Sequence, residues 1–129
     1  GRLENIEFLG FLPYHEVDRH FDAASIFINT SGLEGFPNTF LQAWSRGIPT
    51  VSYFDCGAKD ESGRIGFVVK DQEELGRVVT RLAGDKDLWS RESLRCKKYF
   101  NSVHSVQAVV SQYENLVNRL YSPGSGHGT

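Results

Sequence analysis

The sequence of 129 residues contains no methionine, only two cysteines and no excess of one charge. Two unclustered cysteines provide neither a disulfide framework nor a zinc site, so we expect a reducing, cytoplasmic location. The 14 Lys and Arg residues balance 16 Asp and Glu residues, which argues against a general attraction to nucleic acid or acidic lipid. No apolar run is long enough to cross a bilayer and no leader opens the chain, so the sequence predicts a soluble protein.

The missing methionine also suggests that residue 1 is not a natural translation start. We therefore expect the sequence to be a piece of something longer. Residues 1–121 are expected to form one N-terminally truncated domain, since their length and composition suit a single core. Residues 122–129 are rich in glycine and serine and are expected to form a flexible tail.

Apolar runs of strand length alternate with stretches of helical period, which is typical of a parallel sheet flanked by helices. The predicted fold class is therefore α/β, with a Rossmann-like open parallel sheet. Strands are expected at 6–9, 25–29, 49–53 and 65–69, and helices at 14–24, 38–47, 71–82, 85–100 and 106–120. The run at 25–29 is apolar almost throughout, so we expect it in the middle of the sheet.

The predicted helix at 38–47 divides cleanly into two faces. Its expected buried stripe consists of residues spaced i, i+3, i+4 and i+7, namely Phe40, Ala43, Trp44 and Gly47. The opposite face carries polar residues: Asn38, Thr39, Gln42, Ser45 and Arg46. Gly47 can end the helix because glycine adopts positive φ without strain.

The loop at 30–37 lies where ligands bind in open parallel sheets, after the carboxyl end of a strand. It leads into a helix N-terminus whose first N–H groups lack helical partners and suit a phosphate or a sugar hydroxyl. Gly32 and Gly35 would let a ligand approach the backbone, and the Glu34 carboxylate could accept hydrogen bonds from hydroxyl groups. The alternative is a solvated glutamate in a tight turn, which is the commoner situation for such a loop.

The polar loop at 54–64 is either a flap over a ligand or a mobile surface connection. Cys56 in this loop has no histidine nearby in the sequence, so a nucleophilic role is not favoured. His15, His20 and His104 lack metal-ligand spacing, so we expect no metal site and assign them solvated or capping roles. The sequence also lacks the glycine-rich motifs that bind dinucleotides or the phosphates of ATP.

The stretch from Glu34 to Val51, EGFPNTFLQAWSRGIPTV, resembles the nucleotide-sugar-binding half of a GT-B glycosyltransferase of glycosyltransferase family 4. Phe8-Leu9-Gly10 upstream and Gly66-Phe67-Val68-Val69 downstream fit the same family order. The resemblance covers about residues 4–121 and implies an incomplete GT-B C-terminal domain.

The resemblance also implies roles for individual residues. Glu34 matches the first carboxylate of the family's E-x7-E motif and is the expected catalytic residue. Donor-binding roles are implied for Gly35, Phe36, Pro37 and Asn38, for Phe11 and Leu12 in the base-contacting loop, and for Gln42. Gln42 stands where the family has a glutamate that binds the ribose hydroxyls, and an uncharged amide weakens that hydrogen bond by about 1 kcal/mol.

The implied activity is retaining transfer of a sugar from a UDP- or GDP-sugar to a glycan or lipid acceptor, as in surface polysaccharide assembly. No tightly bound cofactor is implied. The expected partner is a missing N-terminal acceptor domain or a separate chain, and the full enzyme could associate peripherally with a membrane. Family members carry an Arg and a Lys that neutralise the departing diphosphate upstream of residue 1, so this piece alone is expected to be inactive.

Two alternatives remain open: a non-catalytic interaction module with a degenerate donor site, and one chain of a split transferase. The last helix in this family commonly crosses toward the other domain. The apolar stripe from Val106 to Leu120 is therefore expected to be partly exposed here and to promote self-association.

Overall fold

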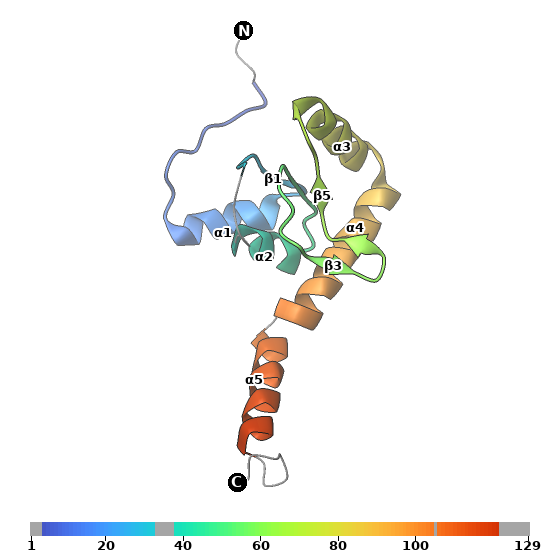
Figure 1. The fold of residues 1–129 in the computed structure, drawn as a ribbon. Coiled ribbons are helices and arrows are strands. Elements are labelled where there is room, and N and C mark those ends of the chain that lie inside the picture. The colour runs from blue at the N-terminus through green and yellow to red at the C-terminus, as the bar shows by residue number, and fades with distance from the viewer. Residues whose placement is uncertain (1–3, 33–37, 105, 122–129) are drawn as a thin grey trace.

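The computed structural model describes residues 4–32, 38–104 and 106–121 and confirms the α/β class (Figure 1). The helices are α1 (Tyr14–Ala23), α2 (Asn38–Ser45), α3 (Gln72–Gly84), α4 (Lys86–Tyr99), the π-helical turn η1 (Phe100–His104) and α5 (Val106–Tyr121). The strands are β1 (Phe27–Asn29), β2 (Thr50–Ser52), β3 (Lys59–Asp60), β4 (Gly63–Arg64) and β5 (Phe67–Val68).

Three of the strands form a parallel sheet in the order β1-β2-β5. The central strand is β2, and all three of its residues are buried. The expectation that the run at 25–29 lies in the middle of the sheet is wrong, because β1 lies at an edge of this sheet and Ile28 is 41% exposed. An apolar run reports how far the faces of a strand are covered, whereas its place in the sheet depends on pairing with distant residues.

The predicted strand at 6–9 is also absent from the structure. Residues 6–9 form no ladder with any described residue, and the Phe8 side chain is 94% exposed. In Figure 1 this N-terminal segment runs outside the sheet. A strand needs a neighbour for its backbone hydrogen bonds, and the described part of the chain provides none at this segment.

Two clusters of side chains make up the core, one on each face of the sheet. On one face, α1, α2 and α4 bury an aromatic cluster centred on Phe40 and Trp44. On the other face, α3 packs Leu82 against Val51 and Val69. The predicted buried stripe of the helix at 38–47 is confirmed, and α2 is therefore fixed on the sheet with its polar face turned outward.

The helix ends follow from local chemistry that the sequence reveals. Asp71 and Asp85 cap α3 and α4, accepting hydrogen bonds from the N–H groups of Glu74 (2.8 Å) and Leu88 (3.0 Å). Gly47 follows α2 with a φ of 72°, which confirms its expected role after the helix.

The last helix, α5, extends away from the sheet (Figure 1). Its apolar side chains are largely exposed, including Val109, Tyr113, Leu116 and Leu120. The expected exposure of this stripe is confirmed, and self-association stays a prediction. Within the described residues, no helix is long and apolar enough to span a membrane.

Candidate donor-binding site

The candidate site begins where β1 ends. The Asn29 side chain accepts a hydrogen bond from the Ser31 N–H at 2.8 Å, which turns the chain after the strand. The residues to which the sequence assigns the central roles, Glu34, Gly35, Phe36 and Pro37, lie outside the described residues. Their roles therefore stay predictions, and the observed geometry concerns the start of α2 and its neighbours.

Asn38 and Gln42 lie one turn apart on α2 and line the same groove between α1 and α2. The groove has a volume of about 250 Å³ and is lined by Val17, Asp18, Phe21, Asn38, Thr39, Leu41 and Gln42. Two of the sequence-predicted donor-binding residues thus share one concave surface. Phe11 and Leu12 do not line it, and the Phe11 side chain is 99% exposed.

Arg46 holds the Gln42 side chain in place. Its Nη1 donates to the Gln42 side-chain Oε1 at 2.8 Å and to the Gln42 backbone oxygen at 3.0 Å. An arginine four residues after a glutamine on one helix face can reach it. The acceptor oxygen of Gln42, on which ribose binding would depend, therefore already receives a charged donor.

The same arginine, which directly follows α2, joins the end of this helix to α1. Its Nε donates to Asp22 at 2.7 Å, its Nη2 lies 3.3 Å from the Asp18 carboxylate, and its guanidinium carbon lies 5.5 Å from the centre of the Phe21 ring. This arrangement places one cation between two carboxylates, of which Asp18 lines the groove. Sequence reasoning placed Arg46 on the polar face but gave it no role in the site. Its i, i+4 spacing from Gln42 was the signal that could have indicated one.

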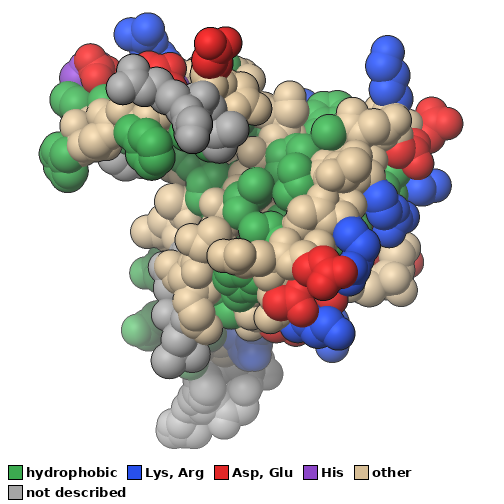
Figure 2. All heavy atoms as spheres, turned by 90° about the horizontal axis from the view of Figure 1, so that it is seen from above, with side chains coloured by type: hydrophobic (Ala, Val, Ile, Leu, Met, Phe, Trp, Pro, Cys, Tyr) green, Lys and Arg blue, Asp and Glu red, His purple; other side chains and the backbone are tan. Residues whose placement is uncertain are grey.

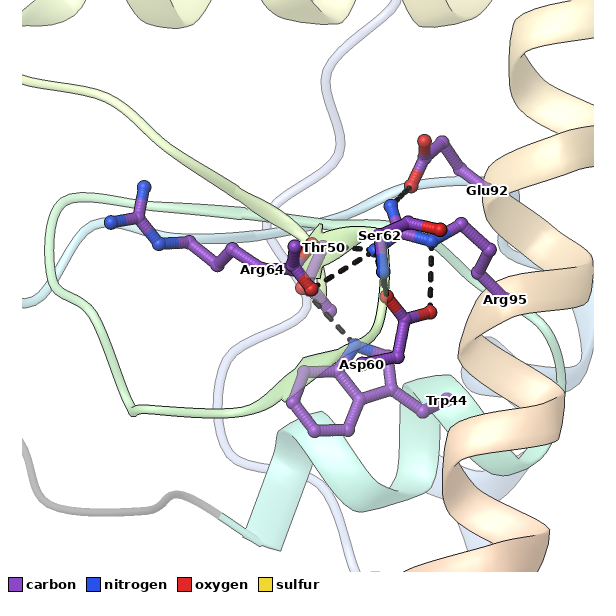
Figure 3. A network of polar contacts seen from close by, with 8 residues as sticks. Trp44, Thr50, Asp60, Ser62, Arg64, Glu92 and Arg95 are labelled. Atoms are coloured by element: carbon purple, nitrogen blue, oxygen red, sulfur yellow. Dashed lines mark hydrogen bonds and ion pairs between the residues drawn. The ribbon is translucent and has the colours of Figure 1, made fainter.

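The loop at 54–64, which follows β2, contains the short antiparallel hairpin β3–β4. Arg95 from α4 holds this hairpin (Figure 3): its guanidinium donates to the Asp60 carboxylate at 2.8 and 3.1 Å and to two backbone oxygens, those of Gly63 and Arg64, both at 3.1 Å. Glu92 binds the remaining nitrogen at 2.9 Å. The hairpin in this loop is thus tied to α4, and the choice between a flap and a surface connection stays a prediction.

Hydrogen bonds also shift the acidity of this loop. The hydrogen bond from Arg95 is the main cause of a lowered pKa at Asp60, against its usual value of 3.8. At Asp55 the pKa is lowered chiefly by the hydrogen bond from the Gly57 N–H, with help from Arg64 at 3.0 Å. Both carboxylates therefore remain charged at neutral pH, and the hairpin keeps its ionic contacts.

Replacing Arg95 with methionine is expected to lower the midpoint of thermal unfolding by about 3–6 °C at pH 7. The pKa of Asp60 is depressed in the folded state, so its stabilising contribution is present above pH 3.8 and is lost as the pH falls further. The difference from the unmodified chain should therefore shrink in acid. Differential scanning calorimetry between pH 3 and pH 7 measures it.

Arg77→Met is the matched control for this prediction. Arg77 forms an exposed pair with Glu73 on α3, and such pairs contribute little to stability. The midpoint of thermal unfolding of Arg77→Met should therefore stay close to that of the unmodified chain. Equal effects of the two substitutions would show that Arg95 does not anchor the hairpin.

Cys56 has the properties of an unreactive thiol. Burial raises its pKa, which keeps the thiol protonated at neutral pH. Burial likewise raises the pKa of Cys96 to about 12. His104 differs from its expected solvated or capping role, because its ring lies partly buried with Nε2 3.3 Å from the Tyr99 hydroxyl, and burial lowers its pKa.

Comparison with known proteins identifies the family. Residues 1–85 match the family model described as glycosyl transferases group 1. The chain belongs to this family. The matched range includes α2, the loop between β1 and α2, and the hairpin β3–β4. The resemblance drawn from the EGFPN stretch is therefore confirmed. Within the residues of this family member that the structure describes, no group of three or more His, Cys, Asp or Glu side chains could hold a metal ion.

Three bacterial proteins are similar in sequence to this chain. The chain is 36% identical over 127 residues to a Salmonella typhimurium protein named as the colanic acid biosynthesis glycosyltransferase WcaL, covering 89% of this chain and 31% of that protein. It is 35% identical over 74 residues to poly(glycerol-phosphate) alpha-glucosyltransferase of Bacillus subtilis, covering 54% of this chain and 11% of that protein. An exopolysaccharide phosphotransferase of Streptomyces coelicolor is 28% identical to the chain over 134 residues, covering 95% of this chain and 13% of that protein. The chain thus spans less than a third of the length of each of these relatives.

Proposed function

We propose that this chain forms the donor-binding part of a retaining glycosyltransferase that uses a UDP- or GDP-sugar and acts in the cytoplasm on a glycan or lipid acceptor. The observation that carries the proposal is the groove at the start of α2, where Asn38 and Gln42 meet within the family-matched range. One relative is named for colanic acid biosynthesis and another as an exopolysaccharide phosphotransferase, which favours a polysaccharide acceptor.

In the proposed reaction the bond between the anomeric carbon and the donor diphosphate breaks, and the acceptor hydroxyl attacks from the same face. The diphosphate carries away the bonding electron pair, and the proton of the acceptor hydroxyl passes to it. Glu34 and the backbone around Gly35 hold the donor in this scheme, while Gln42, steadied by Arg46, contacts the ribose. Catalysis then depends on stabilising negative charge on the departing diphosphate.

The cations for that stabilisation are proposed to come from outside these 129 residues. Arg46 is engaged by two carboxylates, and Arg64 pairs with Asp55. We therefore expect the chain alone to be inactive and to act with an acceptor domain or partner chain, in an enzyme that associates peripherally with the membrane. Measurable sugar transfer by the purified chain would overturn this part of the proposal.

Calorimetric titration with UDP and GDP tests the donor site directly. One of the two nucleotides is expected to bind, and Gln42→Glu should tighten binding about 5-fold because a carboxylate accepts a stronger hydrogen bond from the ribose hydroxyls. The same substitution should tighten binding of the 2′-deoxy form of that nucleotide by less, because this form lacks one of the ribose hydroxyls. Gln72→Glu is the matched control, because it makes the same change of charge at an exposed position on α3.

The second candidate function is a non-catalytic interaction module. The exposed apolar side chains of α5 and the engagement of Gln42 by Arg46 favour it. Absence of heat with either nucleotide at millimolar concentration, for both the unmodified chain and Gln42→Glu, would favour the module over the donor site.

A further inference from the structure

The groove between α1 and α2 combines apolar side chains with a carboxylate. Among the described residues that line it, Asp18 is the one with an ionisable side chain, while Val17, Phe21 and Leu41 are apolar. Its volume of about 250 Å³ lies below the range of about 300–1,000 Å³ that is usual for sites of whole drug-sized ligands. The groove therefore suits one ring of a ligand, with polar groups to bind the hydroxyls of that ring.

The Asp18 carboxylate can still accept hydrogen bonds from a ligand. Arg46 Nη2 lies 3.3 Å from its Oδ1, whereas the contact of the same arginine with Asp22 is shorter, at 2.7 Å. Within the described part of the chain, Oδ2 of Asp18 has no hydrogen bond or ion pair. The side chain is 42% exposed, so a solute can reach it. Since one cation faces two carboxylates, one negative charge stays uncompensated beside the groove.

The Gln42 amide, in contrast, already uses its acceptor oxygen. Arginine carries N–H donors and no acceptor, so the amide turns its oxygen toward Arg46, whose Nη1 donates to it at 2.8 Å. A ligand hydroxyl that donates a hydrogen bond therefore finds a better acceptor in the charged carboxylate of Asp18. Because two nitrogens of one guanidinium contact Gln42 and Asp18, both side chains lie close enough to contact the same sugar ring.

We propose that Asp18 is a ribose-binding residue of the donor site: its carboxylate accepts a hydrogen bond from a ribose hydroxyl, and Arg46 is the positioning residue that keeps Asp18 beside Gln42. This inference rests on the proposed function, because it requires the nucleotide to bind in this groove. An ionised carboxylate only accepts hydrogen bonds, so a deoxyribose that lacks the hydroxyl leaves it without a donor. Asp18 thereby makes the groove selective for ribonucleotides over deoxyribonucleotides.

The alternative role for Asp18 is that of a partner in a surface ion pair. Figure 2 shows acidic and basic side chains in mixed groups around the margin of the molecule, and exposed pairs of this kind contribute little to stability. Asp18 differs because it lines a groove together with Asn38 and Gln42. Asp22 makes the shorter contact with Arg46 and does not line this groove. The two aspartates of α1 therefore separate ligand binding from ion pairing.

Calorimetric titration tests the proposal with whichever of UDP and GDP binds, and with the 2′-deoxy and 3′-deoxy forms of that nucleotide. Asp18→Asn is expected to weaken binding of the ribonucleotide about 5-fold, because a neutral amide accepts a weaker hydrogen bond than a carboxylate. The same substitution should change binding of at least one deoxy form little, because the hydroxyl that Asp18 contacts is then absent. Equal losses for the ribonucleotide and both deoxy forms would overturn the proposal.

Asp22→Asn is the matched comparison, because it makes the same change one turn further along α1 beside the same arginine. If Asp18 acted only by holding Arg46, Asp22→Asn would weaken binding at least as much as Asp18→Asn, since the Asp22 contact is the shorter one. We expect a smaller loss for Asp22→Asn, of the same size for the ribonucleotide and its deoxy forms. An equal or larger loss would assign Asp18 to ion pairing alone.

A double variant shows whether Asp18 and Gln42 act on the same sugar. In the Asp18→Asn background, Gln42→Glu should tighten ribonucleotide binding by more than the factor of about 5 expected in the unmodified chain, because the new carboxylate then replaces the lost one. Equal gains in the two backgrounds would contradict a shared sugar. Absence of binding by the unmodified chain would overturn the proposed function and this inference together. Binding that does not respond to Asp18→Asn would overturn this inference alone.

Discussion

Gly66→Ala is expected to lower the free energy of unfolding by about 2–5 kcal/mol. Gly66 has a φ of 82°, a conformation that costs an L-residue about 1–2 kcal/mol. A methyl group there would also collide with the Thr50 hydroxyl oxygen, and overpacking a buried site costs about 1–3 kcal/mol. Thr50 lies in the central strand, so neither residue can move without disturbing the sheet.

The matched control for this prediction is Gly76→Ala. Gly76 lies within α3, and a methyl group at this position would meet no atom within 4 Å. Alanine there should stabilise the helix by about 0.5–1 kcal/mol. Urea titration followed by circular dichroism measures both variants, and a loss below about 1 kcal/mol at Gly66 would contradict the close approach to Thr50.

Local chemistry made the helices of this chain predictable. The side chains that cap α3 and α4, the glycine after α2 and the periodic stripe of Phe40, Ala43 and Trp44 all act within a few residues. Their effects can therefore be read from sequence spacing, and the structure confirms them. The alternation of apolar runs with stretches of helical period predicted the α/β class, and the stretch at 34–51 added the family resemblance.

Strand pairing was less predictable because it depends on residues far away in the chain. The sequence indicated an apolar run at 25–29, but its edge position follows from which strands are present to pair with it. The run at 6–9 has strand composition and forms no ladder with the described residues. Both departures concern the pairing partners of a strand, which local sequence patterns do not report.

The candidate site shows the same division between local and distant effects. The sequence placed Asn38 and Gln42 on one polar face, and the structure brings both to one groove. It did not indicate that Asp18 and Asp22 on α1 would hold Arg46 against Gln42, since that contact spans about two dozen residues or more. Similarly, the composition of the loop at 54–64 gave no sign that Arg95 would anchor it.

Trp44→Ala is expected to lower the free energy of unfolding by about 3–5 kcal/mol, because Trp44 is fully buried and its removal leaves a cavity that the sheet cannot close. Its ring packs 5.4 Å from the Phe40 ring and 5.6 Å from the Tyr99 ring, measured between centroids. Its indole N–H donates to the Thr50 hydroxyl at 3.2 Å (Figure 3), so the substitution also leaves a buried hydroxyl without this donor.

Trp89→Ala provides the comparison, since the second tryptophan of the chain is only half-buried and also donates one indole hydrogen bond, to Ser25. Trp89→Ala should lower the free energy of unfolding by about 1–2 kcal/mol. Trp44 fixes the buried face of α2, and Asn38 and Gln42 lie on the opposite face of the same helix. Loss of Trp44 should therefore also weaken nucleotide binding. Urea titration measures the stability of both variants, and calorimetry on the same samples measures their nucleotide binding. Similar stability losses for the two tryptophans would contradict the placement of Trp44 at the centre of the core.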